Sequence, residues 1–301
     1  MSPDYSVDVR FHAPPDDLRR FFTTFYHTEI TTPPGEVMAD SLQPEWGNLR
    51  FFEGTAPVTW FDGEEPLRDS HFTATGPSSR PAHFRMGPSR IWGVGMLPLG
   101  WMQFMRLGAA DHINLVADGM THPSFAQFVP LAQTLFGPVR DEAGELARMI
   151  EAFRGLLAEP TPDELRIQAI HAALVDPQLG TVCELVDRVG ASQRTVERIC
   201  QRAFGFSPKL LLRRQRFMRS LAQFMLDPSL RWIGAMDWQY HDQAQFVRDF
   251  REFMGVSPRE YAAIPHPVLD KFIHMRARVA GAPVQTMDRP EGVIPRSAAA
   301  D

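Results

Sequence analysis

The chain has 301 residues, of which 44% are hydrophobic and 22% charged, and its formal net charge is -5. This composition is typical of a globular protein, and the length allows two ordinary domains. No stretch approaches the roughly 18 apolar residues of a membrane span, and the N-terminus lacks the basic and apolar segments of a secretory signal, so we expect neither.

Residues 1–160 combine strand and helix patterns. Short runs of β-branched and aromatic residues, separated by Gly and Pro, predict strands at residues 48–54, 57–61, 71–75 and 91–97. Apolar residues three and four positions apart then predict helices at residues 142–157 and at 123–136, where Pro130 kinks or splits the helix. The predicted fold class is therefore α+β, with a small β-sheet or barrel backed by helices.

The segment AEPTPD at residues 158–163 marks the expected domain boundary. Thr161 is a good N-cap, and Pro162 suits the first position of a helix. Nearly everything beyond it has a helical pattern, ending with a short helix at 268–279 and a last stretch without any apolar period. The predicted parts are an N-terminal domain, an all-α domain, and a short helix with a disordered tail, at residues 1–160, 161–265 and 266–301.

Positive charge is concentrated in the second half of the chain. Residues 1–160 hold 12 basic and 20 acidic residues, whereas residues 161–265 hold 14 basic and 12 acidic ones. Eight of the basic residues lie between Ser192 and Arg219, together with a single acid, Glu197. A cluster of charged residues usually lies on a solvated surface without a binding role. The spacing of these residues is therefore the evidence needed to judge whether they bind a polyanion.

Two segments of the all-α half repeat at an offset of 50 residues. Residues 196–208 (VERICQRAFGFSP) align with residues 246–258 (FVRDFREFMGVSP), and both end in Gly-x-Ser-Pro. Each unit has an apolar helical stripe, a turn, a capping Ser or Asp, and a second helix with a polar outer face. Two copies of one helix–turn–helix unit are the natural inference, although two hairpins of a purely structural domain also fit.

The polar faces of these second helices suit DNA. In a helix-turn-helix the second helix enters the major groove, where Arg can bond a guanine edge and Gln an adenine edge at two points. Basic residues beside it can hold phosphates. The candidates for DNA contact are Gln193, Arg194, Glu197, Arg198, Lys209, Arg213, Gln243, Ala244 and Arg248.

The two repeats resemble the halves of an AraC/XylS-type DNA-binding domain. The most specific part is YHDQAQFVRDFREFMGVSPREY, and the likeness covers about residues 165–263. The resemblance implies two helix-turn-helix units, joined by a linker helix at about residues 208–226, that enter successive major-groove segments about 34 Å apart. This sequence departs from the family at Gln239, where Gly is usual and a positive φ is often needed, and at Trp238 and Cys200.

The stretch GPSSRPAHFRMGPSRIWGVGMLPLGW at residues 76–101 resembles a sensor-like domain that precedes this DNA-binding domain in one bacterial subgroup. That resemblance implies that residues 1–160 sense a small molecule or mediate dimerisation. Aromatic residues on or beside the predicted strands could line an apolar effector pocket, although such residues more often fill a core. The pocket candidates are Phe52, Trp60 and Trp92.

The sequence carries no signal for catalysis or for a cofactor. The histidines of the first half show none of the H-x-H, H-x-x-x-H or H-E-x-x-H spacings of metal sites. No nucleophile elbow, phosphate loop or dinucleotide fingerprint occurs. We therefore expect no catalytic residue, no metal, no cofactor and no enzymatic activity. The only cysteines, Cys183 and Cys200, are too few for a disulfide framework and favour a reducing, cytoplasmic location.

These patterns together predict a bacterial, sequence-specific transcription regulator. Its expected partners are double-stranded operator DNA, a small-molecule effector, a second copy of the chain and, for an activator, RNA polymerase. One alternative joins the same DNA-binding domain to an N-terminal enzyme. The other is a protein-interaction module that has lost sequence-specific DNA binding, which the unusual second turn and the overall acidity would suit.

Overall fold

The computed structural model describes residues 5–290 and contains an antiparallel sheet of six strands in the order β1-β2-β8-β4-β6-β9. A second antiparallel sheet has three strands in the order β3-β7-β5. Both sheets are open. Of the two predicted alternatives, a β-sheet or a barrel, the N-terminal part therefore forms sheets, and no barrel is closed within residues 5–290. The strands are β1 (Ser6–His12), β2 (Phe22–Thr31), β3 (Met38–Leu42), β4 (Asn48–Gly54), β5 (Val58–Trp60), β6 (Phe72–Thr75), β7 (Ala82–Met86), β8 (Ser89–Met96) and β9 (Val116–Asp118).

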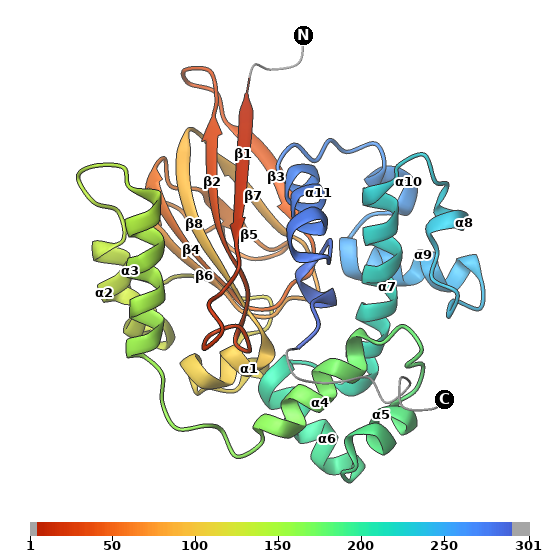
Figure 1. Ribbon diagram of the computed structural model, residues 1–301. Coiled ribbons are helices and arrows are strands. Elements are labelled where there is room, and N and C mark those ends of the chain that lie inside the picture. The colour runs from red at the N-terminus through yellow and green to blue at the C-terminus, as the bar shows by residue number, and fades with distance from the viewer. Residues whose placement is uncertain (1–4, 291–301) are drawn as a thin grey trace.

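The six-stranded sheet is covered on both faces. Helix α3 (Glu142–Gly155) lies on one face, and the second sheet and helix α11 (Leu269–Ala280) lie on the other (Figure 1). All eight residues of β8 are buried as a result. Side chains alternate along a strand, so Trp92 in β8 faces α3, whereas its neighbour Ile91 and the cross-strand partner Phe52 face the second sheet.

Short helices connect the sheet to the all-α part. The helical segment at residues 123–136, which Pro130 was predicted to kink or split, consists of a 3-10 helix and α2. Pro130 lies in the first turn of α2, where a missing N–H is harmless. A π-helical turn, η1, and two 3-10 helices complete this region. The elements are α1 (Pro98–Gly100), η1 (Trp101–Met105), η2 (Ala109–His112), η3 (Pro123–Phe128) and α2 (Val129–Thr134).

The second half contains the two predicted helical units. The repeated Gly-x-Ser-Pro motif has the same role in both: Gly205 and Gly255 end one helix at positive φ, and Ser207 and Ser257 cap the next one. Proline then occupies the first turn of each following helix. The helices are α4 (Glu164–Val175), α5 (Val182–Val189), α6 (Gln193–Ile199), η4 (Cys200–Phe204), α7 (Pro208–Leu226), α8 (Trp232–Ala235), α9 (Gln243–Met254) and α10 (Pro258–Tyr261).

The apolar core does not divide at residue 160. One cluster of buried residues runs from Leu18 in the sheet domain to Leu211 on α7 and includes the core of the first helical unit. A second cluster joins α7 and α9 to Leu269 and Ile273 of α11. The first helical unit is therefore packed directly on the sheet domain. Within residues 5–290, no helix is long and apolar enough to cross a membrane.

The segment after the second helical unit returns to the sheets. The Asp40 carboxylate of β3 accepts hydrogen bonds from the Val268 and Leu269 amides, at 2.8 and 2.9 Å, and so caps α11. A 3-10 helix, η5 (Gln285–Met287), follows, and Gln285 and Thr286 are buried. The predicted disorder is therefore wrong for residues 281–290, because long-range contacts order a segment without any apolar period. Residues 291–301, for which disorder was also predicted, lie outside the described part of the chain.

Candidate DNA interface and ligand cavity

Helix α6 presents the polar face that the sequence predicts. Ser192 caps its first turn, accepting a hydrogen bond from the Thr195 amide at 3.2 Å, while Val196 and Ile199 are buried. Four of the DNA-contact candidates are exposed on this helix: Gln193, Arg194, Glu197 and Arg198. Arg194 has no ion pair within residues 5–290, whereas Arg198 pairs with Asp163 at 3.0 Å.

Helix α9 has the equivalent arrangement in the second unit. Asp242 caps it through the Gln245 amide at 2.7 Å, and Phe246, Phe250 and Phe253 are buried in the core. The three candidates of this helix, Gln243, Ala244 and Arg248, are exposed. In the described part of the chain Arg248 has no acidic partner, so its guanidinium is available to an outside acceptor.

The linker helix α7 uses most of its basic residues inside the protein. Arg213, one of the DNA-contact candidates, forks onto Asp249 and Glu252, and Arg216 also reaches Asp249, at 3.0 Å. Two further basic residues of α7 are also used inside the protein: Arg214 is fully buried, and Arg219 pairs with Asp237. Lys209, the remaining candidate here, is exposed. The positive charge of α7 thus mainly holds the second unit in place, and this arrangement disfavours Arg213 as a phosphate contact.

Arg214 of α7 contacts the sheet domain directly. Its Nη1 donates to the Ser78 carbonyl at 2.7 Å, and its guanidinium lies 4.0 Å from the centre of the Trp46 ring. No carboxylate pairs with it among the described residues, and burial lowers its pKa to about 9. Cation–π contacts of this kind are stronger when water is excluded, so the orientation of α7 is tied to Trp46.

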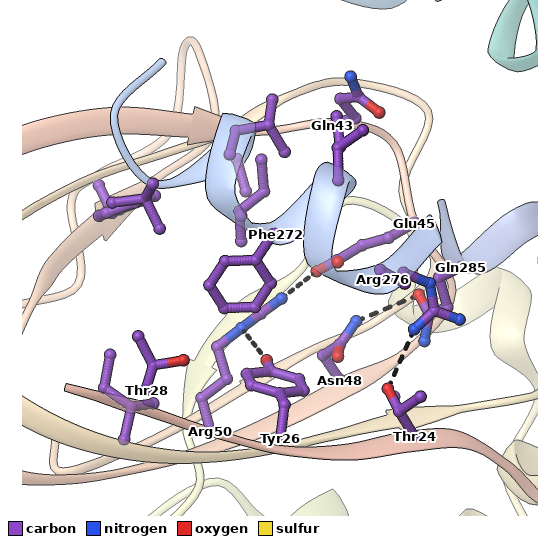
Figure 2. Close-up of a pocket in the computed structure, with 18 of the residues that line it drawn as sticks. Thr24, Tyr26, Thr28, Gln43, Glu45, Asn48, Arg50, Phe272, Arg276 and Gln285 are labelled. Atoms are coloured by element: carbon purple, nitrogen blue, oxygen red, sulfur yellow. Dashed lines mark hydrogen bonds and ion pairs between the residues drawn. The ribbon is translucent and has the colours of Figure 1, made fainter. Parts of the chain in front are cut away.

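A cavity of about 130 Å³ lies between the two sheets. Alternate residues of β2 and β4 form its floor, among them Tyr26 and Arg50, while α11 and residues 283–285 close it (Figure 2). Of the three predicted pocket residues, only Phe52 lines it. Trp92 lies on the opposite face of the sheet and donates to Glu145 at 2.7 Å, and Trp60 stacks on His83. The structure therefore does not bring these three side chains together.

The charged groups at the cavity are arranged in pairs. Figure 2 shows Arg50 between the Glu45 carboxylate and the Tyr26 hydroxyl, which accepts from the Arg50 Nε at 3.0 Å. Burial alone would lower the pKa of Arg50, but the Glu45 carboxylate and the Tyr26 hydroxyl raise it, so the guanidinium stays charged. Arg276 of α11 donates to the Thr24 hydroxyl at 3.0 Å and pairs with Asp288. These polar residues gave no signal in the sequence, since they come from distant segments of the chain: β2, residues 45–50, α11 and Asp288.

Comparison with known families identifies the type of domain in the helical half. The family described as a helix-turn-helix domain matches residues 185–264, which include both α6 and α9. Residues 185–264 form an AraC/XylS-type helix-turn-helix domain.

Solved structures with some likeness to the whole chain are also known. The 1.65 Å structure of ToxT from Vibrio cholerae is 9% identical, with 86% of this chain and 98% of that chain covered and a TM-score of 0.42. An unsaturated fatty acid bound ToxT from Vibrio cholerae strain SCE256 is 10% identical over 87% and 96%, with a TM-score of 0.40. The AraC-like transcriptional activator CuxR is 15% identical over 72% and 87%, with a TM-score of 0.28. No curated protein matches the chain.

The unusual turn of the second AraC/XylS-type unit is well formed. Gln239 does not require a positive φ, because the described non-Gly residues with positive φ are Asp69, Arg106 and Asn114. Its side-chain amide donates to the Pro177 and Leu179 carbonyls, at 2.8 and 3.2 Å. Its Oε1 accepts from Arg219 at 3.0 Å. Gln239 therefore links this turn to the segment before α5 and to α7, and it does so without the positive φ that its position in the sequence had called into question.

Residues 284–287 link the cavity to the linker helix of the AraC/XylS-type domain. The Gln285 side chain accepts from the Trp46 amide at 2.9 Å and forms part of the cavity wall. The next residue, Thr286, accepts through its carbonyl from the Gln215 side chain of α7 at 2.7 Å. Val284 and Met287 pack into the core between α7 and α9. This short segment thus lines the cavity through Val284 and Gln285 and contacts α7 through Thr286.

We expect Asp163→Asn to raise the affinity for DNA. Asp163 precedes α4 and holds Arg198, and the hydrogen bond from Arg198 keeps the pKa of its carboxyl below the usual value. Because Arg198 is half exposed, the pair is weak, and its removal should strengthen DNA binding by up to about fivefold. Fluorescence anisotropy with labelled DNA measures the effect. Asp16→Asn, which removes an acid paired with Arg19 elsewhere, is the matched control, and equal gains in both variants would show only a change in net charge.

Proposed function

We propose that this protein is a sequence-specific, DNA-binding transcription regulator. The observation that carries the proposal is the AraC/XylS-type domain, with two helices, α6 and α9, that are capped alike and expose Arg and Gln side chains. Such side chains read base edges in the major groove, while neighbouring basic residues bind phosphates. Gln193, Arg194, Glu197, Arg198, Lys209, Gln243, Ala244 and Arg248 are the proposed contacts.

We propose further that the sheet domain binds a small-molecule effector in the cavity between its sheets. Support comes from the position of the cavity between the sheets and from the segment 284–287, which contacts both its wall and α7. A ligand that displaces Gln285 would shift Thr286 and its contact with Gln215. Because α7 joins α6 to α9, such a shift alters the spacing of the two reading helices and hence the preference between DNA sites.

Selection of genomic DNA by the purified full chain, followed by sequencing, tests the DNA-binding part of the proposal. We expect a recurrent site with two short blocks about one helical turn, or 10 base pairs, apart. Affinity for this site should fall steeply as salt rises from about 50 to 200 mM, because phosphate contacts release counterions. Recovery of fragments that share no sequence would reject sequence-specific regulation and favour a protein-interaction module with charge-driven DNA binding.

A further inference from the structure

We infer that the cavity takes an uncharged, mainly apolar molecule of roughly the size of a benzene ring, with one hydrogen-bonding group. This inference rests on the effector role proposed above and specifies the chemical class of the ligand. It follows from the charge, the unpaired polar atoms and the size of the cavity.

Each of the two arginines at the cavity already has an acidic partner. Arg50 is paired with Glu45 and Tyr26. Arg276 is paired with Asp288 and Thr24 through its Nη atoms, while its buried Nε has no hydrogen-bond partner among the described residues. A ligand carboxylate or ammonium group would therefore be buried without a counter-charge unless it broke one of these pairs. Burying an unpaired charge is strongly unfavourable, so the cavity selects against both anions and cations.

Two hydroxyl groups at the cavity have no hydrogen-bond partner among the described residues. They belong to Thr28 on β2 and Thr73 on β6, and both residues line the cavity and are at least 98% buried. The Tyr26 hydroxyl accepts from Arg50, so its own proton remains to be donated. A buried polar group without a partner is costly. Strands β8 and β4 lie between β2 and β6, so one ligand hydroxyl or carbonyl can satisfy one of these groups.

The volume of the cavity and its apolar lining residues indicate the size and the apolar part of the ligand. A volume of about 150 Å³ accommodates one benzene molecule, and the cavity between the sheets measures about 130 Å³. Most other lining side chains are apolar, including Phe52, Phe84 and Phe272. Aromatic walls of this kind favour a flat apolar ring, which can pack against them edge-on or offset.

Calorimetric titration of the full chain at neutral pH with four probes of one shape tests the inference. The probes are benzyl alcohol, toluene, benzoate and benzylammonium. We expect benzyl alcohol to bind about fivefold more tightly than toluene, because of its hydrogen bond, and at least tenfold more tightly than either ion. Equal or tighter binding of benzoate or benzylammonium, or no measurable binding of any probe, would overturn the inference.

The double variant Thr28→Val and Thr73→Val locates the hydrogen-bonding group. It should weaken benzyl alcohol binding about fivefold and leave toluene binding unchanged, which also shows that the cavity is still folded. Thr134→Val, on the exposed surface of α2, is the control. Unchanged benzyl alcohol binding in the double variant would contradict the role of the two hydroxyls. Since no titration contains DNA, failure here leaves the DNA selection unaffected, and failure of that selection leaves these results intact.

Discussion

Replacement of Arg194 and Arg248 together by alanine is expected to reduce operator binding to nearly the affinity for random DNA. These two arginines are exposed on α6 and α9 and have no acidic partner within residues 5–290. A bidentate contact from Arg to a base discriminates by about 1–3 kcal/mol, so two such contacts are worth roughly a hundredfold or more. Competition of labelled operator with unlabelled operator and random DNA measures this ratio directly.

A control that removes the same charge elsewhere separates the loss of base contacts from the loss of positive charge. Arg68→Ala with Arg278→Ala removes the same charge from exposed positions in the sheet domain and on α11. This control should lower the affinity for operator and random DNA alike and keep their ratio. If the Arg194 and Arg248 variant also kept the ratio of the unmodified chain, α6 and α9 would not be the helices that read sequence.

The helical half could be predicted from the sequence because its signals are local. The repeated Gly-x-Ser-Pro motif spans four residues, and in the structure Gly205 has a positive φ, Ser207 caps α7 and Pro208 lies in its first turn. The apolar period then gives the buried face of each helix, as at Val196 and Ile199. The fork of Arg213 onto Asp249 was not predictable, because the partners lie 36 residues apart on helices whose packing the sequence does not specify.

The cavity could be predicted only in part, because its residues are set by strand register. Phe52 pairs with Ile91, and Phe51 pairs with Trp92, so Phe52 and Trp92 point to opposite faces of the sheet. Both strands were predicted, but the pairing between them depends on long-range contacts. The same holds for Gln285, which lies 237 residues from its partner Asn48 in a segment that has no apolar period.

Glu145→Ala is expected to lower the free energy of unfolding by about 3 kcal/mol or more. The Glu145 side chain is fully buried on α3, where it accepts two hydrogen bonds from Arg90, at 2.9 and 2.7 Å, and one from Trp92, at 2.7 Å. Its loss leaves the Trp92 donor unpaired and the buried guanidinium of Arg90 with Glu53 alone. Urea denaturation followed by intrinsic fluorescence measures the change.

Two comparisons separate the loss of the ion pair from the loss of volume. Glu145→Gln keeps the shape and an acceptor and should cost less than Glu145→Ala, whereas Arg90→Met combined with Glu145→Leu removes both charges and should recover much of the stability. Binding of benzyl alcohol under native conditions should be the same in all three, because Glu145 and Trp92 lie on the face of the sheet away from the cavity. A large change in that affinity in a folded variant would mean that Trp92 takes part in the ligand site, as the sequence had suggested.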